Sequence, residues 1–383
     1  MASIQKRPDG RYRARYRDAG GSEHARHFGR KIDAQQWLDE VTASIVTGQY
    51  VNPKAGRVTL TEYAGQWEAA QVGSQATARI VDNALRLHIL PVLGTRPVAS
   101  LRRSDVQGLM KRLSSELAPN SIKAVYNVLS RVTGSAVLDR VIASSPCHRI
   151  QLPAVAEHEV VPLTARQVQE RAAVMPSEYR AAVIMLAGSG LRIGELLGLR
   201  VADVDFLRRT VRVERQRLQE GRIGPPKTPK SVRTVPIGQV VVDGLAAHLV
   251  AHPSEEWLFT DGSEWLGYRR WRTVWNAGHA TLQAAEDQAA GRESRDRLVV
   301  PKYGTHDLRH FFASALIAGG ASVKQVQAVL GHSSAVVTLR VYAHLWPGDE
   351  DRTRAIIDAT LDGLRTVHGP GDLEAGSAAG QRG

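Results

Sequence analysis

Residues 305–316 read THDLRHFFASAL, and their spacing predicts a helix with one apolar face. The apolar side chains recur every three or four residues and form the predicted buried face: Leu308, Phe311, Phe312, Ala315 and Leu316. Thr305 is a residue type that often caps a helix N-terminus. His306 and Arg309 would then point the same way beside free backbone N–H groups, an arrangement that favours an anion.

The same stretch also has the spacing of a zinc site, because His306 and His310 are four residues apart. A metalloprotease helix carries a glutamate directly after the first histidine, whereas this chain has Asp307 there. Catalytic zinc needs three protein ligands, and a third is not apparent nearby. The stretch therefore favours an anion cradle over a metal site.

Length and net charge limit the class of protein to which this chain can belong. The 383 residues are enough for two or three domains, and the net charge of +12 favours a polyanion such as nucleic acid. Residues 1–31 hold nine basic and three acidic residues, which is half of that excess. Cys147 is the single cysteine, so an internal disulfide and a cysteine zinc cluster are excluded. No apolar run suits a membrane span or a signal peptide, and together with the single cysteine this favours a reducing, intracellular (cytoplasmic) setting with no membrane partner.

The first segment predicts a small sheet with a helix behind it. Residues 10–18, GRYRARYRD, have the period of two of a strand, and 23–29 would be the returning strand. The helix that follows has an apolar stripe: Trp37, Leu38, Val41 and Ile45. We expect a domain over 1–55 with four arginines on its open face: Arg11, Arg13, Arg15 and Arg17. A sheet laid on DNA is the functional interpretation, and a solvated edge strand is the alternative.

The rest of the chain predicts two further domains, giving a multidomain α+β fold. Residues 57–150 repeat helix signals, with Pro91 and Pro119 expected to interrupt between helices. Residues 145–164 resemble a linker in composition, and 160–365 mix helices with strands. In that third domain the alternating runs 210–217 and 231–237 predict a hairpin. The Gly- and Ala-rich residues 366–383 are expected to be disordered.

Further charged side chains gather in the third domain. The glycine spacing of GSGLRIGELLGL (188–199) differs from a dinucleotide fingerprint, so we interpret it as a turn that delivers Arg192 to a helix start. Glu195, three residues on, would hold its guanidinium. Ser322 and Gly331 predict the start and end of a short helix, which His332 follows, and the next helix ends near Tyr342. A single histidine or tyrosine in such a position is usually a core residue. The functional interpretation therefore depends on finding arginines, histidines, a lysine and a tyrosine together in this domain.

Five motifs in this order resemble the tyrosine recombinase family, specifically phage-type integrases: GLRIGEL, PPKTPKSVRTVPI, HDLRHFFAS, LGHSS and VYAH. The resemblance covers residues 160–365 almost entirely, although 276–302 is less typical of the family. Residues 57–150 and 1–55 resemble its helical core-binding domain and its arm-binding domain. The resemblance implies a site-specific recombinase that cuts and rejoins DNA through a 3′-phosphotyrosine, and so integrates, and excises, a phage or other mobile element.

The resemblance also implies the site residues. Tyr342 would be the nucleophile, and Lys227 would protonate the leaving 5′-oxygen, with Lys230 as the competing lysine. Four residues would hold the phosphate: Arg192, His306, Arg309 and His332. His306 would also accept the Tyr342 proton, while Glu195 and Asp307 would orient their basic neighbours. No ATP is expected, because one phosphodiester is exchanged for another, and no metal is expected, because two guanidinium groups can stabilise the phosphate charge; no cofactor is implied.

The implied partners are double-stranded DNA at core and arm sites and further copies in a homotetramer, with a host DNA-bending protein and an excisionase as accessory factors. Four alternatives stay open: a chromosome- or plasmid-resolving recombinase, a relaxing enzyme like the type IB topoisomerases, a DNA-binding regulator with an inactive site, and a zinc hydrolase. The arm-like first segment opposes the topoisomerase, and the intact set of Arg192, His306, Arg309 and Tyr342 opposes the regulator.

Overall fold

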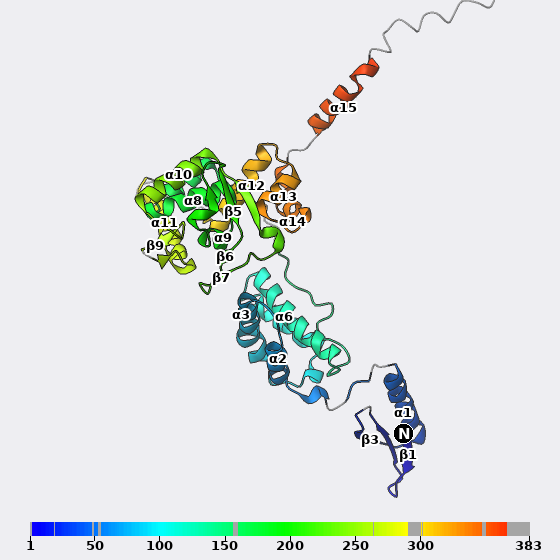
Figure 1. Cartoon of the computed structure of the whole chain (residues 1–383). Helices are drawn as coiled ribbons and strands as arrows, with labels where there is room; N and C mark the ends of the chain where they lie inside the picture. Colours follow the sequence, from blue (N-terminus) through cyan, green and yellow to red (C-terminus); the bar gives the residue numbers. More distant parts are fainter. Residues whose placement is uncertain are drawn as a thin grey trace, which may run out of the picture. The chain divides into compact units, whose positions relative to one another are not determined.

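The computed structural model describes residues 2–18, 20–47, 50–52, 55–155, 160–262, 264–289, 300, 302–346 and 350–365. These residues belong to two compact units, Met1–Glu157 and His158–Gly383 (Figure 1). The first unit contains two separate apolar clusters, one under the N-terminal sheet and one inside a helical bundle. The second unit has a single larger cluster.

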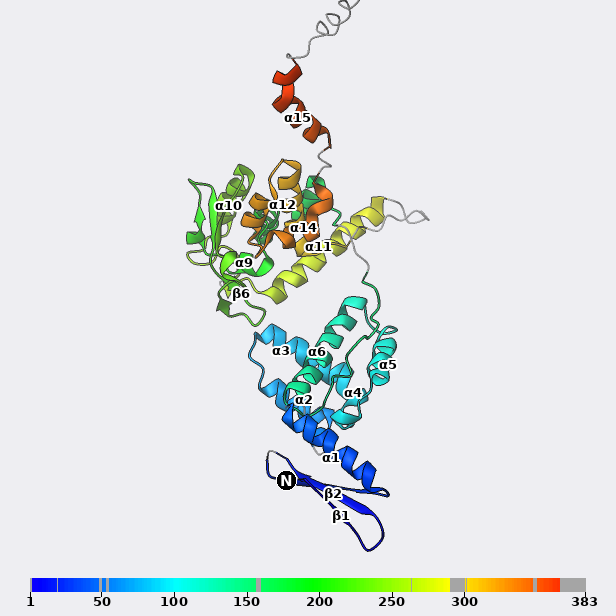
Figure 2. The same ribbon diagram turned by 90° about the vertical axis from the view of Figure 1, so that its right-hand side faces the viewer.

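The N-terminal sheet has three antiparallel strands in the order β1-β2-β3, and α1 packs on one of its faces (Figure 2). The bounds are β1 Ser3–Lys6, β2 Tyr12–Arg17, β3 Glu23–Phe28 and α1 Lys31–Val46. Ala14 and Tyr16 of β2 are buried against Ala34 and Leu38 of the helix. The alternation predicted for residues 10–18 is therefore confirmed, and β1 is an additional strand.

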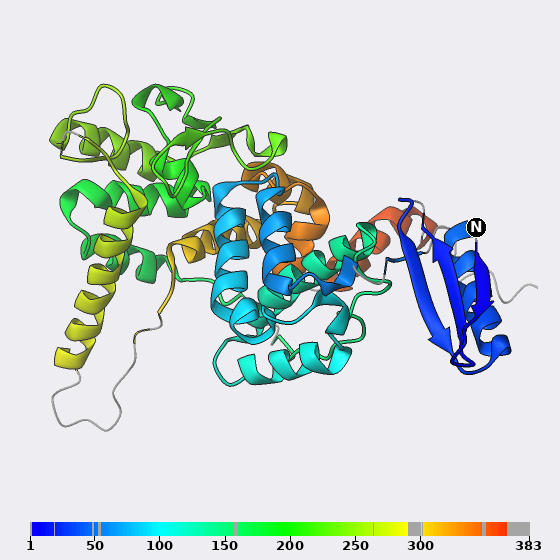
Figure 3. The same cartoon turned by 90° about the horizontal axis from the view of Figure 1, so that it is seen from below.

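The helical part of the first unit is the light-blue to cyan group in Figure 3. Its elements are η1 Ala55–Arg57, α2 Leu60–Ala69, α3 Gln75–Asn83, η2 Ala84–Ile89, α4 Leu90–Leu93, η3 Val98–Ser100, α5 Arg103–Leu113 and α6 Pro119–Leu138. The predicted interruption at Pro91 is wrong, because α3, the π-helical η2 and α4 follow one another without a break. Pro91 lacks an N–H donor, and wider i→i+5 turns just before it accommodate that loss. Pro119 lies in the first turn of α6, where no donor is needed.

The second unit surrounds the buried helix α8, which contacts α7, α10 and α12. Its helices are α7 Ala165–Ala173, α8 Ser177–Ser189, α9 Ile193–Leu197, η4 Val201–Asp203, η5 Pro229–Ser231, α10 Gln239–Ala251, α11 Tyr268–Ala289, α12 Thr305–Ala318, α13 Val323–Leu330, α14 Ala335–Tyr342, η6 Ala343–Leu345 and α15 Glu350–Arg365. Its strands are β4 Val204–Asp205, β5 Thr210–Val213, β6 Gln216–Arg217, β7 Ile223–Gly224, β8 Arg233–Pro236, β9 Thr260–Asp261 and β10 Glu264–Trp265.

The hairpin predicted from residues 210–217 and 231–237 is confirmed, because β5 pairs antiparallel with β8. Between them the chain makes a further short hairpin, β6 with β7, and β4 completes a sheet of order β4-β5-β8. Strand β8, which begins with Arg233, is an edge strand of this sheet, and Lys227 and Lys230 lie in the segment between β7 and β8. Among the described residues, none of the helices combines the length and the apolar character that crossing a membrane requires.

Helix α12 forms where THDLRHFFASAL predicts it, but Thr305 is its first helical residue and not its N-cap. Gly304 occupies the cap, and its backbone N–H donates to the Asp307 carboxylate (2.6 Å). Ser322 and Gly331 start and end α13 as predicted, with Gly331 at a φ of 65°. The predicted disordered tail, 366–383, and residues 290–299 and 301 of the less typical stretch lie outside the described residues.

Candidate active site

Arg192 is fixed at the start of α9 by a carboxylate that it shares with a second arginine. Arg192 Nη1 donates to Glu195 Oε1 (2.8 Å), and the Arg192 backbone N–H donates to Glu195 Oε2 (2.9 Å). Arg233 of β8 donates to the same two oxygens, from Nη1 (3.2 Å) and Nη2 (2.9 Å). Glu195 is 1% exposed, whereas the Arg192 side chain is 35% exposed. Glu195 thus fixes the orientation of the Arg192 guanidinium, while part of the Arg192 side chain stays accessible to solvent.

The Glu195 carboxylate stays ionised in this setting. Burial alone would raise its pKa, but the hydrogen bonds and charges of Arg233 and Arg192 lower it below the usual value. Two guanidinium groups therefore share one negative charge. The trio of Arg192, Glu195 and Arg233 keeps a net charge of +1.

Arg309 on α12 is the deepest cation of the site, at 1% exposure. Two carbonyl oxygens hold its guanidinium: Nη1 donates to Gly190 O (2.6 Å) and Nη2 to Leu330 O (2.7 Å). These carbonyls come from the turn before Arg192 and from the end of α13. Burial and the charge of Arg192 lower the pKa of Arg309 to about 9, so the group is cationic at neutral pH. Arg309 thereby connects the three segments of the site.

His306 and His332 add two neutral imidazoles beside the arginines. His332 follows α13, and its Nδ1 pairs with Thr338 Oγ1 of α14 (2.9 Å). Desolvation and then the nearby positive charges lower the pKa of both histidines to about 4. At neutral pH each ring is uncharged and can donate one hydrogen bond to an anion.

Tyr342 is the last residue of α14 and is 1% exposed. Its hydroxyl pairs with Nδ1 of His310 (2.8 Å), a residue of α12 one turn after His306. Burial raises the pKa of Tyr342 to about 12, while the charge of Arg309 acts in the opposite direction. The phenol therefore lies within the electrostatic reach of the arginine cluster and is protonated at neutral pH.

The two lysines differ in their contacts. Lys227 is exposed in the segment between β7 and η5, with no hydrogen bond or ion pair of its own among the described contacts. Lys230 donates from Nζ to Ser333 O (2.9 Å), beside the turn that carries His332. Asp307 is engaged with the backbone of Gly304, so it caps α12 and does not contact an arginine there. Described contacts and electrostatic interactions thus link the other predicted site residues of the second unit into one cluster, and none of them involves Lys227.

The four predicted N-terminal arginines lie in the other unit. Arg13, Arg15 and Arg17 alternate along β2 on the face that α1 leaves open, and Arg11 precedes the strand. The side chains of Arg13, Arg15 and Arg17 are 40%, 47% and 66% exposed, and each has a guanidinium nitrogen 3.4–3.9 Å from a carboxylate oxygen of Glu23. One carboxylate thus offsets part of three positive charges.

Sequence reasoning missed two residues of the site, Arg233 and His310. Arg233 carried a signal: it shares the inward face of β8 with the fully buried Val235, and a charge at an inward position needs a partner. His310 was noted only as a possible metal ligand. Within the described parts of the chain, no group of three or more His, Cys, Asp or Glu side chains could hold a metal ion.

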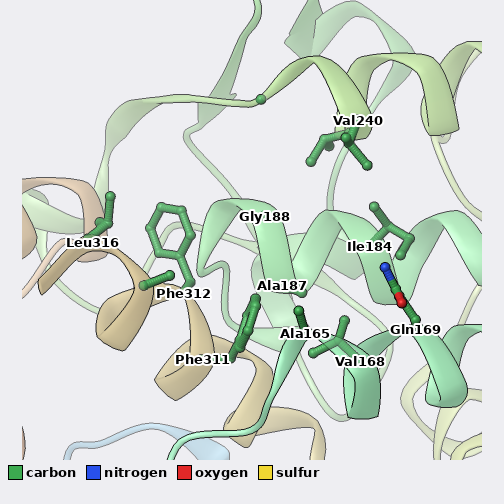
Figure 4. Close-up of a pocket in the computed structure, with 13 residues that line it drawn as sticks. Ala165, Val168, Gln169, Ile184, Ala187, Gly188, Val240, Phe311, Phe312 and Leu316 are labelled. Atoms are coloured by element: carbon green, nitrogen blue, oxygen red, sulfur yellow. The ribbon is translucent and has the colours of Figure 1, made fainter. Parts of the chain in front are cut away.

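An apolar groove of about 420 Å³ lies elsewhere on the second unit, between α7, α8, the start of α10 and α12 (Figure 4). Phe311, Phe312 and Leu316 line it from α12, and Ile184 and Val240 line it from α8 and α10. None of the arginines, histidines or tyrosines of the candidate site lines this groove.

Comparison with known proteins gives the family. The sequence profile of the phage integrase family matches residues 159–347, and that of the phage integrase N-terminal domain matches residues 2–47. The integrase of Mycobacterium phage FRAT1 is 28% identical over 335 residues, which is 84% of this chain and 97% of that protein. The tyrosine recombinase XerC of Mycobacterium bovis is 32% identical over 234 residues, covering 56% of this chain and 68% of XerC.

Solved structures agree on the fold. A structure of the Tn1549 transposon integrase in complex with a circular intermediate DNA superposes with a TM-score of 0.65 at 23% identity, covering 79% of this chain and 99% of that one. A lambda integrase dimer bound to a core site gives a TM-score of 0.56 at 17% identity, covering 90% and 94%. The chain belongs to the phage integrase family, and it is a site-specific recombinase of the tyrosine recombinase type.

Proposed function

We propose that Tyr342 is the nucleophile and that the arginine cluster holds the DNA phosphate it attacks. The observation that carries this proposal is the convergence of Tyr342, Arg309 and Arg192 from three separate segments onto one site. The phenol oxygen forms a bond to phosphorus while the bond from phosphorus to the 5′-oxygen breaks. The products are a 3′-phosphotyrosine and a free 5′-hydroxyl. The 5′-hydroxyl of a partner strand then attacks the phosphotyrosine and reverses the cleavage step.

The arginines suit this step because negative charge develops on the nonbridging phosphate oxygens. Arginine stays protonated and presents a planar fork of donors to two oxygens. Arg192 is partly exposed, so a phosphate can reach it, and Arg309 is held by hydrogen bonds to two carbonyls. Removing one such preorganised donor typically slows a reaction about 100- to 1000-fold. These fixed charges supply the stabilisation that a metal ion gives in other phosphoryl-transfer enzymes, so we propose a reaction that needs neither metal nor ATP.

Lys227 is our proposed acid for the leaving 5′-oxygen. Its side chain is exposed and lies in the segment between β7 and β8, and β8 begins with Arg233, the arginine that contacts Glu195. Lys230 is the less suitable candidate, because its ammonium is bound to a backbone carbonyl. Glu195 and Asp307 act indirectly, through Arg192 and through the start of α12.

The DNA partner follows from the relatives. The lambda and Tn1549 integrase structures contain core-site and circular-intermediate DNA, and one lambda structure is a tetramer on a Holliday junction. We propose the same substrates for this chain: residues 57–150 and 160–365 bind core DNA, and 1–55 bind arm sites. Acting on attachment sites of a phage or other mobile element, the enzyme would work at the host chromosome, assisted by a DNA-bending protein and an excisionase.

A tetramer would cover apolar surface that one copy leaves open. On α15, Ile356, Ile357 and Leu361 are 56%, 50% and 48% exposed. These side chains are chemically complementary to the apolar groove of Figure 4, and we propose that α15 of a neighbouring copy occupies that groove. Deleting residues 350–383 should then preserve cleavage at a single core site but lower strand exchange between two sites.

The test of the nucleophile uses core-site DNA with a nick close to the cleavage point, so that the short released strand diffuses away and the covalent adduct accumulates. The wild-type protein should form a protein–DNA adduct in the presence of a chelator, and Tyr342→Phe should form none. An adduct that persists in Tyr342→Phe would place the nucleophile elsewhere. Strand exchange between two duplexes, beyond relaxation of a supercoiled circle, separates the recombinase from a topoisomerase.

A further inference from the structure

The residue that contacts the Tyr342 hydroxyl is His310. Its Nδ1 lies 2.8 Å from Oη of Tyr342, a normal hydrogen-bond distance. The two ring centroids are 5.6 Å apart. No described hydrogen bond joins His306 to the hydroxyl; the His306 ring instead meets the His310 ring edge-on, at a centroid distance of 4.9 Å.

This contact is held from both sides. Tyr342 is almost fully buried at the end of α14, and His310 is half-buried in the middle of α12. The turn after His310 is tied down by Ser314, whose Oγ donates to the His310 carbonyl oxygen (2.8 Å). The position of the imidazole relative to the phenol therefore depends on two packed helices and not on a flexible loop.

We propose that His310 accepts the proton of Tyr342 during DNA cleavage and returns it during rejoining. This inference rests on the proposed function, in which Tyr342 is the nucleophile. It assigns to His310 the role that the family resemblance implies for His306, and it leaves His306 to donate a hydrogen bond to the phosphate.

In cleavage, one proton moves to His310 while one bond to phosphorus replaces another. The Oη–H bond of Tyr342 breaks and its proton goes to Nδ1 of His310, while Oη forms a bond to phosphorus. The bond from phosphorus to the 5′-oxygen breaks, and that oxygen takes a proton from a separate acid, for which Lys227 is the candidate. In rejoining, the incoming 5′-hydroxyl attacks phosphorus, its proton goes to that acid, and Oη leaves and recovers the proton from His310.

The surroundings keep His310 ready to accept. Burial lowers its pKa below the usual value of a histidine; the Asp307 charge acts to raise it and the Arg309 charge to lower it further. Tyr342 faces it from α14. His344, in the neighbouring η6, is turned to Val160 O (3.1 Å). A neutral imidazole has one free ring nitrogen, and a phenol whose pKa is about 12 needs such an acceptor.

The experiment measures the rate of adduct formation on nicked core-site DNA for His310→Gln across a range of pH. Glutamine can retain a hydrogen bond to the phenol but cannot take up its proton. We expect a rate about 100- to 10,000-fold lower, the usual contribution of a general base. The wild-type rate should fall in acid as His310 becomes protonated, and this dependence should be absent in His310→Gln. His344→Gln is the matched control and should keep the wild-type rate.

A substrate with sulfur in place of the bridging 5′-oxygen separates the two proton transfers, because a thiolate leaves without a proton. It should rescue Lys227→Ala but not His310→Gln; rescue of His310→Gln would assign His310 to the leaving group and overturn the proposal. An unchanged rate and pH profile in His310→Gln would overturn it as well.

Two further variants keep the result interpretable. If His310→Gln fails to fold, His310→Ala with added imidazole replaces it: restored adduct formation supports the proposal, and no restoration in a folded variant that binds core DNA contradicts it. Tyr342→Phe tests the proposed function separately, since an adduct in that variant removes Tyr342 as the nucleophile whatever His310 does.

Discussion

Replacing Arg233 with methionine should damage the enzyme in a way that a second substitution partly repairs. Arg233 makes two hydrogen bonds to Glu195 (2.9 and 3.2 Å), one from Nε to Val329 O (2.7 Å) and one to Ser231 O (2.9 Å). Its side chain is 6% exposed and that of Glu195 is 2% exposed. Arg233→Met therefore leaves a buried carboxylate with one partner in place of two. Breaking a buried ion pair from one side costs about 3–5 kcal/mol of unfolding free energy.

The effect on catalysis follows from the charge count. With Arg233 present, the Glu195 charge is shared and the trio with Arg192 is net +1; without it, Glu195 and Arg192 neutralise each other in front of the phosphate. We expect adduct formation to fall about 100- to 1000-fold, the typical loss for one preorganised donor. Adding Glu195→Gln restores the net charge to +1, because the amide still accepts a hydrogen bond from Arg192 but carries no charge. The double variant should therefore cleave faster than Arg233→Met alone.

The assay is a double-mutant cycle read in two ways, by denaturant unfolding and by the initial rate of adduct formation on nicked DNA. In stability, we expect the two substitutions to be non-additive by about 2 kcal/mol, within the usual range for residues in direct contact. Arg166→Met is the control, since the Arg166–Glu170 pair is a surface pair whose arginine is 86% exposed, and such pairs contribute less than about 1 kcal/mol. The reasoning is refuted if Arg233→Met with Glu195→Gln cleaves as slowly as Arg233→Met alone.

Three further outcomes are expected. Lys227→Ala should slow adduct formation by about 100-fold, whereas Lys230→Ala should mainly destabilise the turn at Ser333; equal rates for the two variants would contradict the assignment. Replacing Arg13, Arg15 and Arg17 with glutamine should lower the salt dependence of arm-site binding by about three units of log–log slope, without changing core-site cleavage; an unchanged slope would contradict the role of the sheet. The folded pKa of His332, about 4, lies below the usual 6.5, so the stability it contributes is present above pH 6.5 and lost as the pH falls toward 4. Between pH 7 and pH 4, His332 should account for at most about 3 kcal/mol of the drop in unfolding free energy, so His332→Gln should reduce that drop; an identical drop in the variant would contradict it.

The parts of the fold that local spacing determines could be predicted from the sequence. The period-two arginines gave β2, the apolar spacing gave α12, and Ser322 and Gly331 gave both ends of α13. The sequence-based predictions were wrong at positions where the same residue is compatible with two local structures. Proline 91 can end a helix or be accommodated by a π-helical turn, and at the start of α12 the glycine before Thr305 took the cap because Asp307 was free to bind its N–H.

The contacts that complete the site could not be predicted, because they join residues far apart in the chain. Glu195 and Arg233 are 38 positions apart, and His310 and Tyr342 are 32 apart. Which of two histidines on one helix contacts the phenol depends on how α12 and α14 are placed in the folded unit, and no local sequence pattern reports that placement. The family resemblance supplied the residue types of the site but assigned the phenol to His306.

Under the proposed mechanism, binding of the DNA phosphate by the arginines and ionisation of the Tyr342 phenol would affect each other. Arg192, Arg233 and Arg309 lie close to one shared carboxylate, that of Glu195; burial and then the positive charges of Arg192 and Arg233 lower the pKa of Arg309. A phosphate relieves the repulsion, so the arginines that orient it also gain from its arrival. The phenol is different: burial raises its pKa, and a phosphate that offsets the Arg309 charge raises it further. Under the proposed mechanism, holding the phosphate would therefore make ionisation of Tyr342 harder, and a proton acceptor in contact with its hydroxyl, His310, would offset that cost.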